Sequence, residues 1–273
     1  MHTKEEKLES IGRLLDIMVE LRNKCPWNAA QTHDTLRPLT LEEVFELSDA
    51  VLQRNDSDTE KELGDLLLHV IFYARVAEEE GKYDIADIAD RECEKMVFRH
   101  PHVFGDGEAE TDACSVSENW EMRKRQENGG KRHILDGVPE SAPSVLKAMQ
   151  IQRKARDVGF DWEKKEDVWA KVREEMDEYE AELRSMCSAP DGPGREAAMD
   201  RAEDELGDFM FATVNAARLY GLDPEVALSR ACSKFRRRFT YLEDNTMGKG
   251  RLLKDMTLSE MDEIWDEAKS KGL

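Results

Sequence analysis

The sequence has little that would place it in a membrane. Its longest apolar run, Leu66 to Phe72, is broken by His69 and is far shorter than the ~20 residues that span a bilayer. Residues 1–20 show no signal-peptide pattern. We therefore expect a cytoplasmic protein with no membrane partner.

Cysteine and strand-forming patterns are also scarce. The five cysteines of this 273-residue chain are odd in number, widely spaced and without a C-x-x-C pair, which favours reduced thiols over disulfides. No segment alternates apolar and polar residues with the period of two that is typical of a strand. Only eight prolines interrupt a composition rich in Glu, Ala, Leu, Lys and Arg, which favours helix. The fold class that follows is all-α.

Positive charge is in deficit. The chain has 40 Lys and Arg against 60 Asp and Glu, which gives a formal net charge of −20. Such a surface repels nucleic acid, so we expect no nucleic-acid partner. An anionic substrate would have to be met by metal ions or by a few well-placed Lys and Arg. No Walker A loop, G-x-G-x-x-G or G-x-S-x-G motif is present to bind or attack one.

Apolar residues recur at helical spacing through most of the chain. Thr40, followed by Glu43, fits a capping box and predicts that a helix begins there. The expected helices cover about residues 8–21, 40–53, 58–80, 85–98, 142–156, 163–186, 196–220, 224–241 and 257–269.

One segment differs from the helical remainder. Residues 105–145 are first rich in Gly, Asp and Ser, include a short amphipathic piece over 116–126, and close with Pro139 and Pro143, as is typical of a connection. We therefore predict an N-terminal helical domain over residues 1–105, a linker region over 106–145 and a C-terminal helical domain over 146–273.

The chain contains the same acidic sequence pattern in two places. Glu42–Glu46 reads EExxE and is followed by ELGD at Glu62–Asp65; Glu174–Glu178 reads EExxE and is followed by ELGD at Glu205–Asp208. Because both copies precede further helices of similar order, the pattern indicates two helical-bundle domains related by duplication.

These spacings suit a metal ion. At about 100° per residue, Glu174, Glu175 and Glu178 share one arc of a helix, and Glu205 and Asp208, three apart, share a face of the next. Clustered carboxylates repel one another unless a cation lies between them, and an all-oxygen ligand set with room for phosphate suits Mg²⁺. A glycine such as Gly207 weakens a helix, and we expect it to allow close helix packing at the metal.

The acids have two alternatives to a magnesium site, a solvated helix face and a di-iron centre. A single EExxE in so acidic a chain would most simply be a solvated helix face, but two copies, each followed by ELGD, favour a metal site. Di-iron carboxylate bundles need Glu-x-x-His, and none of the six histidines has a Glu three residues before it.

At these residues the sequence resembles the MazG family of nucleoside triphosphate pyrophosphohydrolases, in its two-domain form. The likeness covers nearly the whole chain. Besides the acidic motifs it rests on further segments: Cys25-Pro26-Trp27, Leu36-Arg37-Pro38, Arg99-His100-Pro101-His102, Leu135-Asp136-Gly137-Val138-Pro139 and Val158-Gly159-Phe160-Asp161-Trp162.

The resemblance implies a fold of the all-α NTP pyrophosphatase type, a homodimer, and Mg²⁺-dependent hydrolysis of nucleoside triphosphates to the monophosphate and pyrophosphate, with Mn²⁺ as a possible substitute. It also implies site residues, with the C-terminal copy as the active one. The implied metal ligands are Glu175, Glu178, Glu205 and Asp208. The implied catalytic groups are Glu174, Glu175, Lys234 and Arg238, and the implied substrate-binding residues are Lys171, Arg201, Lys234, Arg238 and Trp265. A second, weaker metal site falls on Glu43, Glu46, Glu62 and Asp65.

Spacing agrees with part of this set. Lys171 precedes Glu175 by one turn, and Lys234 and Arg238 are four apart and could grip phosphate oxygens. The alternative for the latter pair is a solvated basic helix end, which the helix dipole favours.

The two copies differ in their cations. Aligned on EExxE, Lys171 corresponds to Leu39; aligned on ELGD, Arg201 corresponds to Asp58. We therefore expect the N-terminal site to bind Mg²⁺ but to hydrolyse triphosphates poorly. Two departures from the family pattern are Arg201, where a Lys is usual, and the insertion at Ser188–Gly194.

The expected function is nucleotide-pool housecleaning by Mg²⁺-dependent triphosphate hydrolysis. The alternatives are a nucleotide-binding regulatory module without turnover, a pyrophosphatase narrowed to one nucleotide such as dUTP or dCTP, and a non-catalytic helical interaction protein.

Overall fold

The computed structural model describes residues 1–105 and 133–273, which form two compact units, Met1–Lys124 and Arg125–Leu273. Every regular element among the described residues is a helix, so the all-α prediction is confirmed. The predicted amphipathic piece at 116–126 lies outside the described residues, and the predicted domain limits stay predictions. Among the described helices, none is long and apolar enough to cross a membrane.

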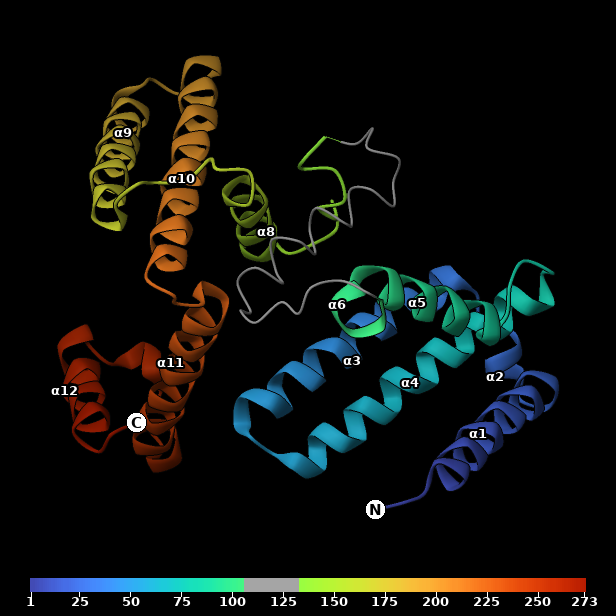
Figure 1. Ribbon diagram of the computed structural model, residues 1–273. Coiled ribbons are helices and arrows are strands. Elements are labelled where there is room, and N and C mark those ends of the chain that lie inside the picture. The colour runs from blue at the N-terminus through green and yellow to red at the C-terminus, as the bar shows by residue number, and fades with distance from the viewer. Residues whose placement is uncertain (106–132) are drawn as a thin grey trace. The chain divides into compact units, whose positions relative to one another are not determined.

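The N-terminal unit is built around one helical hairpin (Figure 1). Helix α3 (His33–Gln53) is followed by α4 (Asp56–Glu79) after only Arg54 and Asn55, so the two helices run antiparallel along each other. Arg54 takes a left-handed conformation with φ of 55° to end α3, and the Asn55 side chain caps α4. The other helices among the described residues of this unit are α1 (Lys4–Lys24), α2 (Pro26–Ala29), α5 (Ile85–Arg99) and α6 (Pro101–Phe104).

The start of α3 differs from the prediction. The capping box is made by Thr32 with Thr35, eight residues before the predicted cap, and Pro38 lies inside the helix. Thr40 is therefore an interior residue of α3, and the prediction that it caps the helix is wrong. Pro38 cannot donate the bond that its position would make to the Asp34 carbonyl, and α3 nevertheless continues past it to Gln53.

An arginine joins the first helices to this hairpin. The Arg22 guanidinium donates to the Gln31 carbonyl at 3.1 Å and to Glu79 Oε1 at 3.1 Å, and it also bonds the Asn28 carbonyl. Its bonds hold the pKa of Glu79 below the ordinary value. The ion pair thus fixes the segment between α1 and α3 to the end of α4.

The interior of the hairpin contains a polar network. Thr40 Oγ1 lies 2.7 Å from His69 Nδ1, 2.9 Å from the Tyr73 hydroxyl and 3.0 Å from the Leu36 carbonyl. A hydroxyl has one hydrogen, so a self-consistent assignment has Thr40 donating to Leu36 and accepting from the other two. Burial lowers the pKa of His69, which favours the neutral ring, and the assignment then places the ring hydrogen on Nδ1.

The C-terminal unit contains a second hairpin. Helix α9 (Val168–Ser188) and α10 (Pro193–Leu219) pack along each other. Only residues 189–192 connect them, because both helices extend into the predicted insertion at Ser188–Gly194. The unit also contains α8 (Ser144–Arg156), α11 (Pro224–Thr246) and α12 (Leu258–Ser270), with short 3₁₀ turns at Lys165–Asp167, Met247–Lys249 and Leu253–Asp255.

The two hairpins carry different interiors at matching positions. When the acidic motifs are superposed along the sequence, Thr40, His69 and Tyr73 correspond to Val172, Ala212 and Ala216. In the C-terminal unit these three join Val168 in a buried apolar cluster. The same hairpin geometry is therefore supported by hydrogen bonds in one unit and by apolar packing in the other.

The first prediction concerns this network. Thr40→Val keeps the side-chain volume but leaves the His69 N–H and the Tyr73 hydroxyl without their shared acceptor, so we expect α3 and α4 to lose about 1–3 kcal/mol of opening free energy. Native-state hydrogen exchange of their amides measures this locally. Thr213→Val is the control, because the exposed Thr213 hydroxyl bonds only its own helix, at the Phe209 carbonyl. Equal losses in the two variants would contradict the prediction.

Candidate metal and phosphate site

Each hairpin brings three carboxylates together. In the C-terminal unit, Glu175 of α9 and Glu205 and Asp208 of α10 each offer an oxygen within 4.8 Å of the other two. We call these three residues the C-terminal triple. Because α9 and α10 are antiparallel and ELGD places Glu205 and Asp208 on one face, the acids meet across the seam between the helices.

The N-terminal unit repeats the arrangement. Glu43 of α3 and Glu62 and Asp65 of α4 meet the same 4.8 Å limit, and we call them the N-terminal triple. The structure thus brings together three of the four predicted ligands in each unit. The fourth, Glu178 or Glu46, is exposed and lies outside the triple.

Repulsion within the triples affects protonation. The pKa of Glu205 is raised by desolvation and then by the negative charges of Glu178 and Asp208. The pKa of Glu43 is raised in the same way, by desolvation and then by Asp65 and Glu46. The fourth acids therefore act on the triples electrostatically. A bound cation would relieve this repulsion.

A lysine partly neutralises each triple. Lys171 Nζ lies 2.7 Å from Glu175 Oε1 and 2.9 Å from Glu174 Oε1. Lys61 Nζ lies 2.8 Å from Glu62 Oε1 and 3.9 Å from Asp65 Oδ2. The pKa of both lysines is raised, chiefly by hydrogen bonds to these glutamates.

The N-terminal triple therefore has a positively charged neighbour of its own, Lys61. Leu39 and Asp58 do replace the positive residues of the C-terminal copy, but Lys61 stands where that copy has Asp204. The sequence comparison missed it because it asked only which C-terminal cations had N-terminal counterparts. The signal was present in the lysine immediately before the first glutamate of ELGD.

One glutamate of each triple is buried. Glu62 is 5% exposed and Glu175 is 7% exposed. Glu62 Oε2 is fully buried and has no hydrogen-bond partner among the described residues. An unpaired buried carboxylate oxygen is costly, and a hard divalent cation is the ligand that an all-carboxylate set suits.

The other predicted substrate residues lie outside the triples, and Arg201 is one turn before Glu205 on α10. Arg201 Nε donates to Glu182 Oε2 at 3.0 Å. Arg238 of α11 donates to the Leu273 carbonyl at 2.7 Å and lies 6.0 Å from the Trp265 ring. Lys234 is exposed on α11. Helix α11 packs mainly against α12, whereas α10 packs mainly against α9, so the chain does not itself bring these three to the acids.

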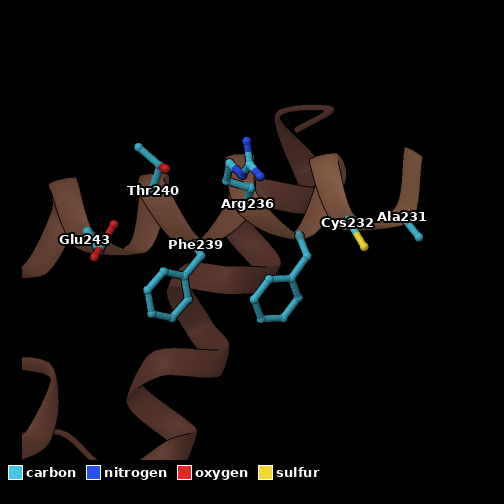
Figure 2. A pocket seen from close by; sticks show the side chains of 7 residues that line it. Ala231, Cys232, Arg236, Phe239, Thr240 and Glu243 are labelled. Atoms are coloured by element: carbon cyan, nitrogen blue, oxygen red, sulfur yellow. The ribbon is translucent and has the colours of Figure 1, made fainter. Parts of the chain in front are cut away.

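Helix α11 instead presents an open apolar face. Figure 2 shows Ala231, Cys232 and Phe239 along a shallow pocket on this helix, with Arg236 and Glu243 at its edges. Phe235, which also lines the pocket, lies tilted against Trp265 with ring centroids 5.0 Å apart and is still 58% exposed.

The role predicted for glycine is not supported. A Cβ added at Gly207 or Gly64 would meet no atom within 4 Å among the described residues. The prediction that Gly207 permits close helix packing at the metal is therefore wrong for contacts within one chain. Both glycines instead leave the outer face of the ELGD segment open.

Comparison with known proteins identifies the chain's relatives. It is 41% identical to a nucleoside triphosphate pyrophosphohydrolase of Escherichia coli K12 over 97% of this chain and 99% of the relative. The chain belongs to the MazG family. It is also 37% identical to the nucleoside triphosphate pyrophosphohydrolase/pyrophosphatase MazG of Thermotoga maritima, over 94% of both chains. The model of the MazG nucleotide pyrophosphohydrolase domain matches residues 31–104, which contain the N-terminal triple.

The second prediction concerns cation binding. Mg²⁺ at about 100 times its dissociation constant should stabilise the MazG chain by ~2.7 kcal/mol per site, seen as a rise in the calorimetric unfolding temperature. Because the pKa of Glu205 and of Glu43 is raised, protons compete with Mg²⁺ already above pH 4.5. The gain should therefore be larger at pH 8 than at pH 5.

The control is the double variant Asp65→Asn, Asp208→Asn, which removes one carboxylate from each triple while keeping its shape. It should lose most of the Mg²⁺-dependent gain. An equal gain in the variant and the unmodified chain, or at the two pH values, would contradict binding at the triples.

Proposed function

We propose that this chain hydrolyses nucleoside triphosphates to nucleoside monophosphate and pyrophosphate, with Mg²⁺ bound at the C-terminal triple, and so serves nucleotide-pool housecleaning. The observation that carries the proposal is the buried Glu175, held with Glu205 and Asp208 and paired to Lys171. Relatives that align over nearly their whole length are named as nucleoside triphosphate pyrophosphohydrolases, which supports the proposal.

The residues present fit a divalent cation. All three ligand groups are carboxylates, and desolvation together with the negative charges of Glu178 and Asp208 raises the pKa of Glu205. Bound there, Mg²⁺ would neutralise phosphate charge and lower the pKa of a bound water. Mn²⁺, which takes similar oxygen ligands, is proposed as a substitute.

The remaining groups take roles that their positions suggest. Glu174 lies outside the triple and its side chain is 56% exposed, so we assign it to orient the attacking water and accept its proton. Lys171 is released from the glutamates and donates to phosphate oxygens as charge develops between the α and β phosphates. Arg201 pairs with Glu182 at 3.0 Å and is assigned to the phosphates after release from that partner.

We further propose a homodimer that takes part in the site. Leu228 is 53% exposed, Phe235 58% and Phe239 37%, all on α11, and such a face favours a protein partner. A second copy covering it would carry its own Lys234, Arg238 and Trp265 toward an acid triple, where they would bind phosphates and stack on the base. The described cysteines are free thiols, which supports a cytoplasmic location.

A regulatory module without turnover remains the second candidate for the N-terminal triple, because it lacks a counterpart of Lys171 on its EExxE helix. A pyrophosphatase narrowed to one nucleotide is distinguished by the breadth of hydrolysis across a panel of triphosphates.

The third prediction tests the reaction. Asp208→Asn removes a ligand of the C-terminal triple and should lower pyrophosphate release by at least about 100-fold, whereas the matched Asp65→Asn should leave most of it. Pyrophosphate and monophosphate are measured together, with Mg²⁺ and with EDTA, and should appear in equal amounts. Equal losses from the two substitutions would contradict the assignment of catalysis to the C-terminal unit.

The fourth prediction tests the dimer. Phe239→Glu places a charge in the apolar face of α11 and should shift the sedimentation of the chain from dimer to monomer, with hydrolysis falling alongside. Leu8→Glu is the control, because Leu8 is 62% exposed on α1 and lies outside this face. A monomeric unmodified chain with full activity would exclude the shared site.

A further inference from the structure

The two triples are paired with lysine in opposite senses. In the C-terminal unit the buried glutamate is Glu175 on the EExxE helix, and its lysine, Lys171, precedes it on that helix. In the N-terminal unit the buried glutamate is Glu62 on the ELGD helix, and its lysine, Lys61, precedes it there. The corresponding glutamates, Glu205 and Glu43, are only half-buried. The lysine and the buried glutamate therefore lie on the EExxE helix in the C-terminal unit and on the ELGD helix in the N-terminal unit.

The geometry at Lys61 is that of a movable counter-ion. Its ammonium bonds Glu62 Oε1, while Glu62 Oε2 is buried and has no partner among the described residues. The Lys61 side chain is 64% exposed, so it can swing outward without disturbing packing. Gly64 leaves the outer face of this segment open, since a Cβ there would meet nothing within 4 Å.

A divalent ion in the N-terminal triple would take over the charge that Lys61 now supplies. Glu62 would then be satisfied on its unpartnered oxygen, and the ammonium would be released at the mouth of the triple. A freed ammonium next to a bound divalent ion is an arrangement that binds a polyphosphate, because the metal takes some oxygens and the lysine takes others.

We propose that Lys61 is the phosphate-binding cation of the N-terminal triple, so that this triple binds a divalent cation together with a diphosphate-bearing anion. The inference rests on the proposed function only in that the carboxylates hold a divalent ion. In this proposal the anion at the N-terminal triple is contacted by a lysine of the ELGD helix, Lys61. At the C-terminal triple the corresponding lysine, Lys171, belongs to the EExxE helix. The shared chemistry is that of a nucleoside triphosphate or of inorganic pyrophosphate.

The alternative is that Lys61 only neutralises Glu62. That role predicts that removing the ammonium weakens the binding of both Mg²⁺ and the anion, because the triple loses its structure. A phosphate-binding role predicts opposite changes in the two affinities. Mg²⁺ binds as well or more tightly because it no longer competes with the ammonium, whereas the anion binds more weakly because it loses a hydrogen-bond donor.

The test uses the full-length chain carrying Lys171→Gln and Asp208→Asn, in which the C-terminal triple is disabled. Titration calorimetry measures Mg²⁺ alone, then the non-hydrolysable α,β-methylene analogue of ATP with Mg²⁺, then inorganic pyrophosphate with Mg²⁺. Adding Lys61→Gln should weaken binding of the analogue, of pyrophosphate or of both by about ten-fold or more, while Mg²⁺ alone binds as well or more tightly. Lys61→Arg should restore anion binding to within about three-fold.

Lys82→Gln is the matched control. Lys82 makes a comparable ion pair, with its Nζ 2.6 Å from Glu80 Oε2, and is similarly exposed, but it lies beyond the other end of α4. Lys82→Gln should change none of the three titrations.

Three results would overturn the inference. They are no Mg²⁺-dependent anion binding by the background chain, unchanged anion binding after Lys61→Gln, and parallel weakening of Mg²⁺ and anion. Pyrophosphate release by the unmodified chain reports separately on the proposed function. If release is absent but Lys61-dependent binding persists, the hydrolysis proposal falls and this inference stands.

Discussion

The structure depends on holding carboxylates of like charge against one another. In each unit three acidic oxygens lie within 4.8 Å, and desolvation, followed by repulsion from neighbouring acids, raises the pKa of Glu43 and of Glu205. A helical hairpin can hold the carboxylates this close only if its packing energy exceeds their repulsion. A nearby ammonium lowers that repulsion. The hairpin, the buried glutamate and its lysine therefore act together to hold the carboxylates in place, and a divalent cation would neutralise their remaining charge.

The hairpin can be stabilised in more than one way. In the N-terminal hairpin, Thr40 is hydrogen-bonded to His69 and Tyr73; in the C-terminal hairpin, Val172, Ala212 and Ala216 pack together. A buried polar network contributes stability only when every member is satisfied, whereas an apolar cluster tolerates more change. The acids have kept their geometry over two different interiors, so the ligand positions are set by the antiparallel seam itself.

Sequence reasoning could predict the helices, the duplication and three acids of each cluster, because periodicity and motif spacing are local. It placed the start of α3 at Thr40 because Thr40 and Glu43 fit a capping box, and it did not foresee that Thr32 and Thr35 would cap a helix running through Pro38. It could not see that Arg201 binds Glu182, because that contact depends on how the hairpin closes. It also counted cations only at aligned positions, and so passed over Lys61, whose partner is its own neighbour Glu62.

Lys61 bears on how residue roles are carried from one copy of a duplicated domain to the other. The acids of the two triples correspond position by position, yet the cation beside them comes from different helices, Lys171 from α9 and Lys61 from α4. A phosphate group bound by both an ion and a lysine must face the helix that supplies the lysine. Two triples with transposed lysines thus cannot hold the same ligand in the same orientation. If each triple binds a metal ion and an anion as proposed, the duplication conserves the carboxylate positions and changes the orientation of the anion, so activity measured at one triple does not establish what the other binds.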